Sequence, residues 1–179
     1  MATMLIATCM MLLFPQDPPS SSGEKLQLVS ELKVFEPLIG KTFRGKFANS
    51  TPEKPVYDVS HWERALNGRA VRILHSVNDG EYGGETMIMW NEKEKRITYW
   101  YFTTAGFVTE GYFEINGKEW VSVEKVTGNK NGITEVKATS SLKEDGSLHV
   151  ISKYLKDNEW VPGHEIHYLP TPSAKVNFR

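Results

Sequence analysis

After Gly40, apolar and polar residues alternate at every second position, in short runs separated by turn-forming residues. Side chains two residues apart on an extended chain point to the same side, so this period predicts strands with one buried and one exposed face. Tight turns are indicated by Asn-Gly and Asp-Gly pairs at 67–68, 79–80, 116–117 and 145–146. Nearly the whole chain after Gly40 is therefore expected to form β-structure.

The turns divide this region into about ten strands. We expect them at residues 41–48, 56–66, 69–78, 82–90, 96–104, 107–115, 119–127, 133–142, 147–156 and 159–168. Because the connections are short, successive strands must pair antiparallel. A long meander leaves two exposed edges, and closing it removes both. The sequence thus predicts an all-β fold, an antiparallel up-and-down β-barrel.

Residues 24–38 predict one helix before the barrel. Their apolar residues recur at three- and four-residue steps, as in an amphipathic helix, and these residues are Leu26, Leu28, Val29, Leu32, Phe35 and Leu38. Pro37 and Gly40 are expected to end the helix. Its apolar stripe must be buried, so we expect the helix to plug or cap one end of a barrel domain formed by residues 39–170.

The N-terminal residues 1–14 contain an apolar run of the length of a signal-peptide core, too short to span a bilayer as a helix. Residues 15–23 are rich in proline and serine and predict a flexible linker. We therefore expect an exported protein, periplasmic or extracellular. Cys9 follows residues similar to a bacterial lipoprotein box, so membrane association is expected only if this segment is retained or Cys9 is lipidated. A ragged chain end is the alternative.

Composition excludes several functional classes. The 179 residues suit one domain plus a short appendage, since an average domain has roughly 150 residues. With 21 Lys and Arg against 22 Asp and Glu, no surplus of positive charge exists to hold a nucleic acid. The one cysteine cannot form an internal disulfide or a cysteine-based metal site. No serine-nucleophile motif is present, and Gly83 and Gly84 lie within a strand, as a bulge or bend requires, rather than before a phosphate-binding helix.

A barrel of this size has either an interior filled by side chains or a pocket for one small ligand. Alternation places many polar side chains inside, and the candidate ligand-binding residues are Trp62, Arg64, His75, Tyr99, Tyr101, Glu124, Tyr154, His164 and Tyr168. An isolated internal charge costs several kcal/mol, so Arg64 and Glu124 need partners. Those partners are either each other, in a packed core, or polar groups of a bound molecule.

The histidines do not predict a metal site formed by several ligands. His164 and His167 are three residues apart on one expected strand, so they point to opposite faces and cannot hold one ion together. No resident cofactor is expected on this ground. The alternative is haem, with His164 as the axial ligand and with Tyr168, Met87 and Met89 nearby.

The leading hypothesis is a non-enzymatic barrel that binds a small hydrophobic or amphipathic molecule, whose polar or acidic head group is oriented by tyrosines and Arg64. Haem binding through His164 is a second hypothesis. A third is an isomerase or cyclase in which Glu124 or His75 transfers a proton. A structural or partner-binding domain with a packed interior is a fourth. Ligand identity and oligomeric state stay open.

Three segments carry a resemblance to a known family: LIGKTFRG at 38–45, WERALNGR at 62–69 and EGYFEINGKEW at 110–120. With them, residues 33–168 resemble a bacterial calycin-like family, the domain-of-unknown-function family numbered fifteen seventy-nine. A looser similarity exists to the haem-binding nitrobindin barrels. The resemblance implies a lipocalin-like or fatty-acid-binding-like barrel with no established reaction, and it transfers no catalytic residues.

Overall fold

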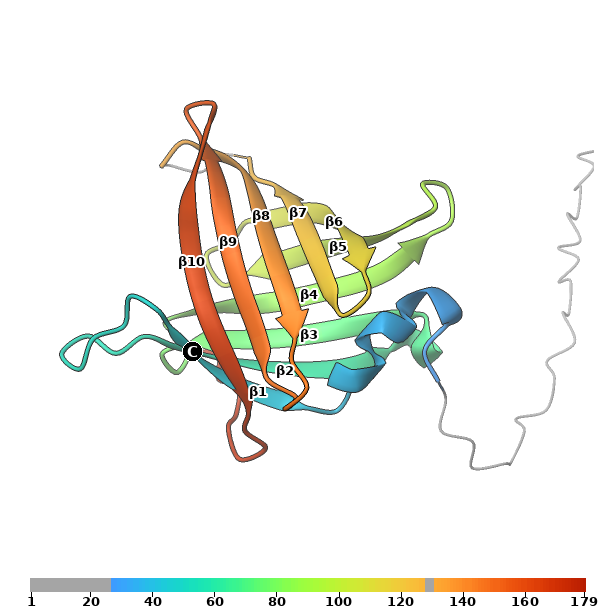
Figure 1. Ribbon diagram of the computed structural model, residues 1–179, viewed down its shortest axis with the longest axis horizontal. Coiled ribbons are helices and arrows are strands. Elements are labelled where there is room, and N and C mark those ends of the chain that lie inside the picture. Colours follow the sequence, from blue (N-terminus) through green and yellow to red (C-terminus); the bar gives the residue numbers. More distant parts are fainter. Residues whose placement is uncertain (1–26, 128–130) are drawn as a thin grey trace, which may run out of the picture.

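A computed structural model describes residues 27–127 and 131–179. It shows a closed antiparallel barrel in which each strand pairs with the next along the chain and β1 pairs with β10 to close the sheet (Figure 1). The strands are β1 (Thr42–Phe47), β2 (Tyr57–Ala65), β3 (Ala70–Val77), β4 (Tyr82–Asn91), β5 (Arg96–Thr103), β6 (Val108–Asn116), β7 (Glu119–Lys125), β8 (Ile133–Leu142), β9 (Leu148–Lys156) and β10 (Glu159–Pro170). The predicted up-and-down barrel is confirmed.

The expected strands are all present, with ends that differ from the predicted ones by about two residues at most. This agreement follows from the turns, which local sequence determines. Asp157 and Asn158, for example, have φ angles of 51° and 65° between β9 and β10, as a two-residue hairpin turn requires. Between β2 and β3, the short 3-10 turn η2 (Leu66–Gly68) makes the connection.

The helix predicted over residues 24–38 is not found over that range. In its place the structure has a 3-10 helix, η1 (Ser30–Leu38), and residues 24–26 lie outside the described part of the chain. A 3-10 helix has three residues per turn, so side chains three apart align on one side. Leu32, Phe35 and Leu38 have this spacing and are all completely buried. The sequence has apolar residues at both three- and four-residue spacing, and the residues buried by η1 are the ones three apart.

The helix η1 lies across one end of the barrel, as Figure 1 shows. Phe35 is the centre of its contacts: its ring centroid lies 5.3 Å from that of Phe113, 5.8 Å from that of Trp120 and 6.0 Å from that of Trp62. These rings come from β2, β6 and β7, so a single side chain ties together strands from different parts of the wall. The helix η1, referred to below as the plug, therefore closes one end of the barrel.

The chain after β10 folds back onto the outside of the barrel. The backbone N–H of Asn177 donates to Oγ of Ser76 on β3, at 3.0 Å, and Arg179 Nε donates to the carbonyl of Asp79 at the β3–β4 turn, also at 3.0 Å. Ser76 points outward, yet it is buried, because this tail covers it. No described helix is long and apolar enough to cross a membrane. The predictions for residues 1–23, a signal peptide or anchor and a linker, fall outside the described residues.

Replacing Phe35 by alanine should destabilise the barrel by about 3–5 kcal/mol, because a fully buried ring and its packing against three aromatic side chains are lost. Urea unfolding followed by tryptophan fluorescence measures this change. Phe102, which is 48% exposed on the outer face of β5, provides the control: Phe102→Ala should cost about 0.5 kcal/mol or less. Equal losses in the two variants would contradict a structural role for the plug.

Candidate ligand-binding cavity

The barrel encloses a cavity of about 640 Å³, within the roughly 300–1,000 Å³ range of small-molecule sites. Trp62, Phe113 and Trp120 line it at the end closed by η1, and Phe47 and Tyr154 line it toward the other end. The wall is mainly aromatic and aliphatic. Among the described residues that line the cavity, none is Lys or Arg. The interior is therefore hollow, and its titratable groups are carboxyls, imidazoles and phenols.

The structure places all but one of the candidate residues at the cavity wall. These wall residues are Trp62, His75, Tyr99, Tyr101, Glu124, Tyr154, His164 and Tyr168. Arg64 is the exception: it is half-buried, does not line the cavity and has no ion pair with Glu124. The alternation of apolar and polar residues predicts which side of a strand a side chain is on, but not its position along the barrel axis. Arg64 lies beyond Trp62, which already contacts the plug at the closed end.

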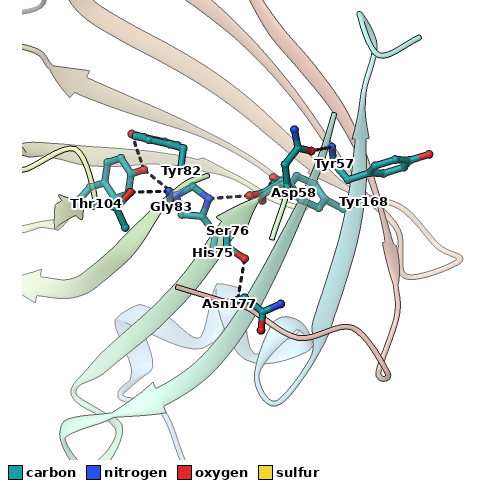
Figure 2. Close-up of polar contacts among 11 residues, drawn as sticks. Tyr57, Asp58, His75, Ser76, Tyr82, Gly83, Thr104, Tyr168 and Asn177 are labelled. Atoms are coloured by element: carbon teal, nitrogen blue, oxygen red, sulfur yellow. Dashed lines mark hydrogen bonds and ion pairs between the residues drawn. The ribbon is translucent and has the colours of Figure 1, made fainter. Parts of the chain in front are cut away.

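Asp58, which is not among the residues predicted from the sequence, is the most buried acid of the wall, with 2% of its surface exposed. His75 Nδ1 lies 2.8 Å from its Oδ1, and the Tyr168 hydroxyl donates to its Oδ2 at 2.7 Å (Figure 2). A carboxylate offers only acceptor sites, so Nδ1 of His75 is the donor in this contact. Asp58 shares the inward side of β2 with Ser60 and Trp62, and the period-2 pattern was therefore the signal that could have found it.

The hydrogen-bonded chain continues from His75 on β3 to tyrosines on the neighbouring strands β4 and β5. His75 Nε2 lies 2.7 Å from the hydroxyl of Tyr101, which is hydrogen-bonded to the hydroxyl of Tyr82 at 2.9 Å. Burial raises the pKa of Tyr101 and of Tyr82 above the ordinary value, so both phenols stay protonated. A connected polar chain thus runs from Asp58 to Tyr82, which borders the cavity.

A second polar pair is formed by Tyr154 and His164. The Tyr154 hydroxyl and His164 Nδ1 are 2.7 Å apart, and Ser152 Oγ accepts from the backbone N–H of His164 at 2.8 Å. Burial lowers the pKa of His164 below its ordinary value, and the nearby Asp58 only partly opposes this effect. The imidazole is therefore neutral around pH 7. No hydrogen bond to its Nε2 is found among the described residues.

Glu124 is the third polar group of the wall. Burial raises the pKa of its carboxyl above the ordinary value of 4.5, and the hydroxyls of Thr109 and Tyr99 partly offset this rise. Burial beside this carboxyl also raises the pKa of Tyr99. Because Glu124 has no cationic partner among the described residues, its carboxyl takes up a proton more readily than an exposed glutamate does.

Each of four tyrosines on the wall lies over a glycine. A Cβ atom built on these glycines would meet the tyrosine ring within about 3 Å, in the pairs Gly45–Tyr168, Gly84–Tyr101, Gly111–Tyr99 and Gly163–Tyr154. A glycine inside a strand commonly marks such a close approach. The β3–β4 register runs through Gly83 and Gly84 without a shift, so the alternative of a bulge at these residues is wrong.

Other expectations about histidines and methionines have mixed outcomes. His164 lines the cavity while His167 is exposed, so the two do point to opposite faces. Met87 and Met89 do not line the cavity, contrary to the expectation that they lie near His164. They alternate with the inward residues Thr86 and Ile88 on β4 and therefore point outward.

The fold has a counterpart among solved structures. The crystal structure of Rv2717c from M. tuberculosis matches with a TM-score of 0.58 and 10% identity, over 80% of this chain and 99% of that chain. At this identity the likeness shows the barrel fold alone. No family model matches the chain, so membership of the family numbered fifteen seventy-nine stays a prediction. No curated protein matches it either.

Glu124→Gln should make the protein more stable than the wild type at pH 8, with a difference that shrinks as the pH falls to 4.5. The pKa of Glu124 is higher in the folded state, so the folded protein keeps a proton that the unfolded chain releases, and stability is lost as the pH rises through the folded-state pKa. The gain is about 1.4 kcal/mol for each unit of raised pKa. Urea unfolding at a series of pH values measures it.

The matched control is Glu114→Gln, which removes an exposed carboxyl from β6. Its difference from the wild type should vary little between pH 4.5 and pH 8. A stability difference for Glu124→Gln that is the same at every pH would show that this carboxyl is not desolvated in the folded protein.

Proposed function

We propose that the protein binds a small, largely apolar and uncharged molecule inside the barrel. The observation that carries this proposal is the cavity itself, about 640 Å³ of unfilled space among aromatic and aliphatic side chains. A packed interior, as a purely structural domain would have, does not leave such a volume. Export through residues 1–14, which lie outside the described part of the chain, is a further part of the proposal.

The charges of the wall support an uncharged ligand over an acidic one. Asp58 and Glu124 are the carboxyl groups of the cavity, and Arg64, the cation expected to hold an acidic head group, lies outside it. An anionic group brought into this interior would lose its hydration without gaining a positive partner. Of the polar or acidic head groups expected from the sequence, a neutral hydrogen-bonding group therefore fits this cavity best.

Donors are available for such a group. The indole N–H of Trp62 is buried at the cavity wall and has no hydrogen-bond partner among the described residues. Buried donors are rarely left unpaired, so an acceptor on a bound molecule, or a water, fits this position. Near the open end, the Tyr82 hydroxyl offers a second polar contact. The apolar part of the ligand supplies affinity, and these groups orient it.

1-Decanol should quench tryptophan fluorescence in a saturable way and should bind at least about tenfold more tightly than decanoate at pH 8, which corresponds to about 1.4 kcal/mol. Both probes bury the same chain, worth about 0.8 kcal/mol per methylene, so the difference reports the head group. Trp62 and Trp120 line the cavity and provide the signal.

Two substitutions on neighbouring positions of β8 provide the control. Ala138 lines the cavity, and Ala138→Leu should weaken decanol binding by filling space, while Thr139→Leu on the outer face should leave it unchanged. Flat fluorescence with both probes, or equal effects of the two variants, would remove the cavity as the binding site.

Haem is a second candidate, supported by the arrangement at His164. The haem iron binds a neutral imidazole, and burial lowers the pKa of His164 and so favours that form. Tyr154 holds Nδ1, which leaves Nε2 as the nitrogen available to iron, and ligating histidines commonly have such a partner on the second nitrogen. Phe47 lies beside the imidazole, with the ring centroids 5.9 Å apart. When bound, haem would supply iron chemistry with small gases or oxidants.

Reconstitution with hemin should give a Soret band if this candidate is right, and His164→Ala should abolish it. His149→Ala removes a histidine from the outer face of the barrel and should leave the band unchanged. Tyr154→Phe keeps the ring and loses the contact to Nδ1, so it should shift or weaken the band rather than remove it. A band that is identical in all four proteins would exclude His164 as the ligand.

A further inference from the structure

Three side chains that commonly bind metals converge on the outer face of β9 and β10, away from the cavity. His149 and His167 are direct partners in the β9–β10 register, and Glu165 precedes His167 by two residues, so all three point to the same side. Their ligating atoms lie within 4.8 Å of one another. We propose that this cluster binds a divalent transition-metal ion, with Zn²⁺ as the reference ion.

The distances within the cluster suit one ion. Glu165 Oε1 lies 2.7 Å from His149 Nε2 and 3.3 Å from His167 Nε2. The two imidazole rings are stacked, with centroids 3.9 Å apart and planes inclined by 16°, so both Nε2 atoms face the same carboxylate. Zinc–ligand bonds of about 2.0–2.2 Å in a tetrahedron put neighbouring ligand atoms about 3.3–3.5 Å apart. Small side-chain rotations reach that geometry.

The ligand set determines which ions fit. Two imidazole nitrogens and one carboxylate oxygen suit Zn²⁺, Ni²⁺ and Cu²⁺, whereas Mg²⁺ and Ca²⁺ prefer oxygen ligands alone. Three protein ligands leave a fourth position for water. The His167 side chain is 65% exposed, so that position is open to solvent. Because ligation needs neutral imidazoles, binding should weaken in acid.

Two neighbouring charges act on the site in opposite directions. The carboxylate of Glu165 lies beside both imidazoles on the outer face and attracts a cation. Lys46 on β1 is the register partner of His167 and lies on the same outer face. Its exposed ammonium group opposes a bound cation, although solvent screens it. Removing Lys46 should therefore strengthen binding.

The test is calorimetric titration of the untagged full-length protein with ZnCl₂ at pH 7.5. The wild type should bind one ion, and His149→Gln and His167→Gln should each weaken this binding by at least about tenfold, since even partners of metal ligands contribute that much. Lys46→Ala should strengthen it. The matched control is His61→Gln, which removes an outer-face histidine whose Nε2 lies 4.0 Å from Glu63. In the part of the chain that the structure describes, His61 belongs to no cluster of metal-binding side chains, so this variant should leave binding unchanged.

Thermal unfolding gives an independent measurement. ZnCl₂ should raise the Tm of the wild type and of His61→Gln in a concentration-dependent way, because an ion held by β9 and β10 stabilises only the folded chain. MgCl₂ should have no such effect. Zinc affinity that is equal in the wild type, His149→Gln and His167→Gln would overturn the proposal, and so would the absence of both heat and a Tm shift in the wild type. Circular dichroism confirms that the variants are folded.

Discussion

The interior stays hollow because four of its tyrosines lie against the wall, each over a strand position without a side chain. Tyr168 lies over Gly45, Tyr101 over Gly84 and Tyr99 over Gly111, and any Cβ at those glycines would collide with the ring. A tyrosine that cannot lie along the wall must extend into the lumen and fill it. The cavity, and every function that depends on a cavity, therefore rests on this close approach of ring to backbone.

The same arrangement satisfies the polar groups. Gly45 is the register partner of both Tyr168 on β10 and Asp58 on β2, so the phenol crosses β1 and donates to the carboxylate on the far side. This contact joins β2, β1 and β10 across the seam where the barrel closes. An unpaired carboxylate in this place would cost several kcal/mol. The Tyr168–Asp58 contact thus stabilises the closure of the barrel.

The strands and turns could be predicted from the sequence because they depend on neighbours along the chain. The period of two and turn residues such as Asp157 and Asn158 act locally, and the strand ends agree closely. Positions across the barrel could be predicted less well. Arg64 was predicted on the inward side of β2, but it lies beyond the end of the cavity. Asp58 lies on the same side of β2 and lines the cavity, although it was not among the predicted residues. Position along the barrel axis depends on where η1 enters, which is a tertiary contact that alternation does not contain.

The bulge in β10 shows how a single residue changes two sites at once. The register with β9 shifts between Pro162 and Glu165. Gly163 lies at this shift, and a side chain on it would collide with Ser152 and Tyr154. If the register next to the β9–β10 turn continued along both strands, His149 would pair with the inward Ile166, and His164 would point outward. The extra residue reverses both: His164 turns into the cavity, and His149 meets His167 on the outer face. A period-2 pattern alone carries no sign of this insertion, so the histidine pair across β9 and β10 became visible only in the folded chain.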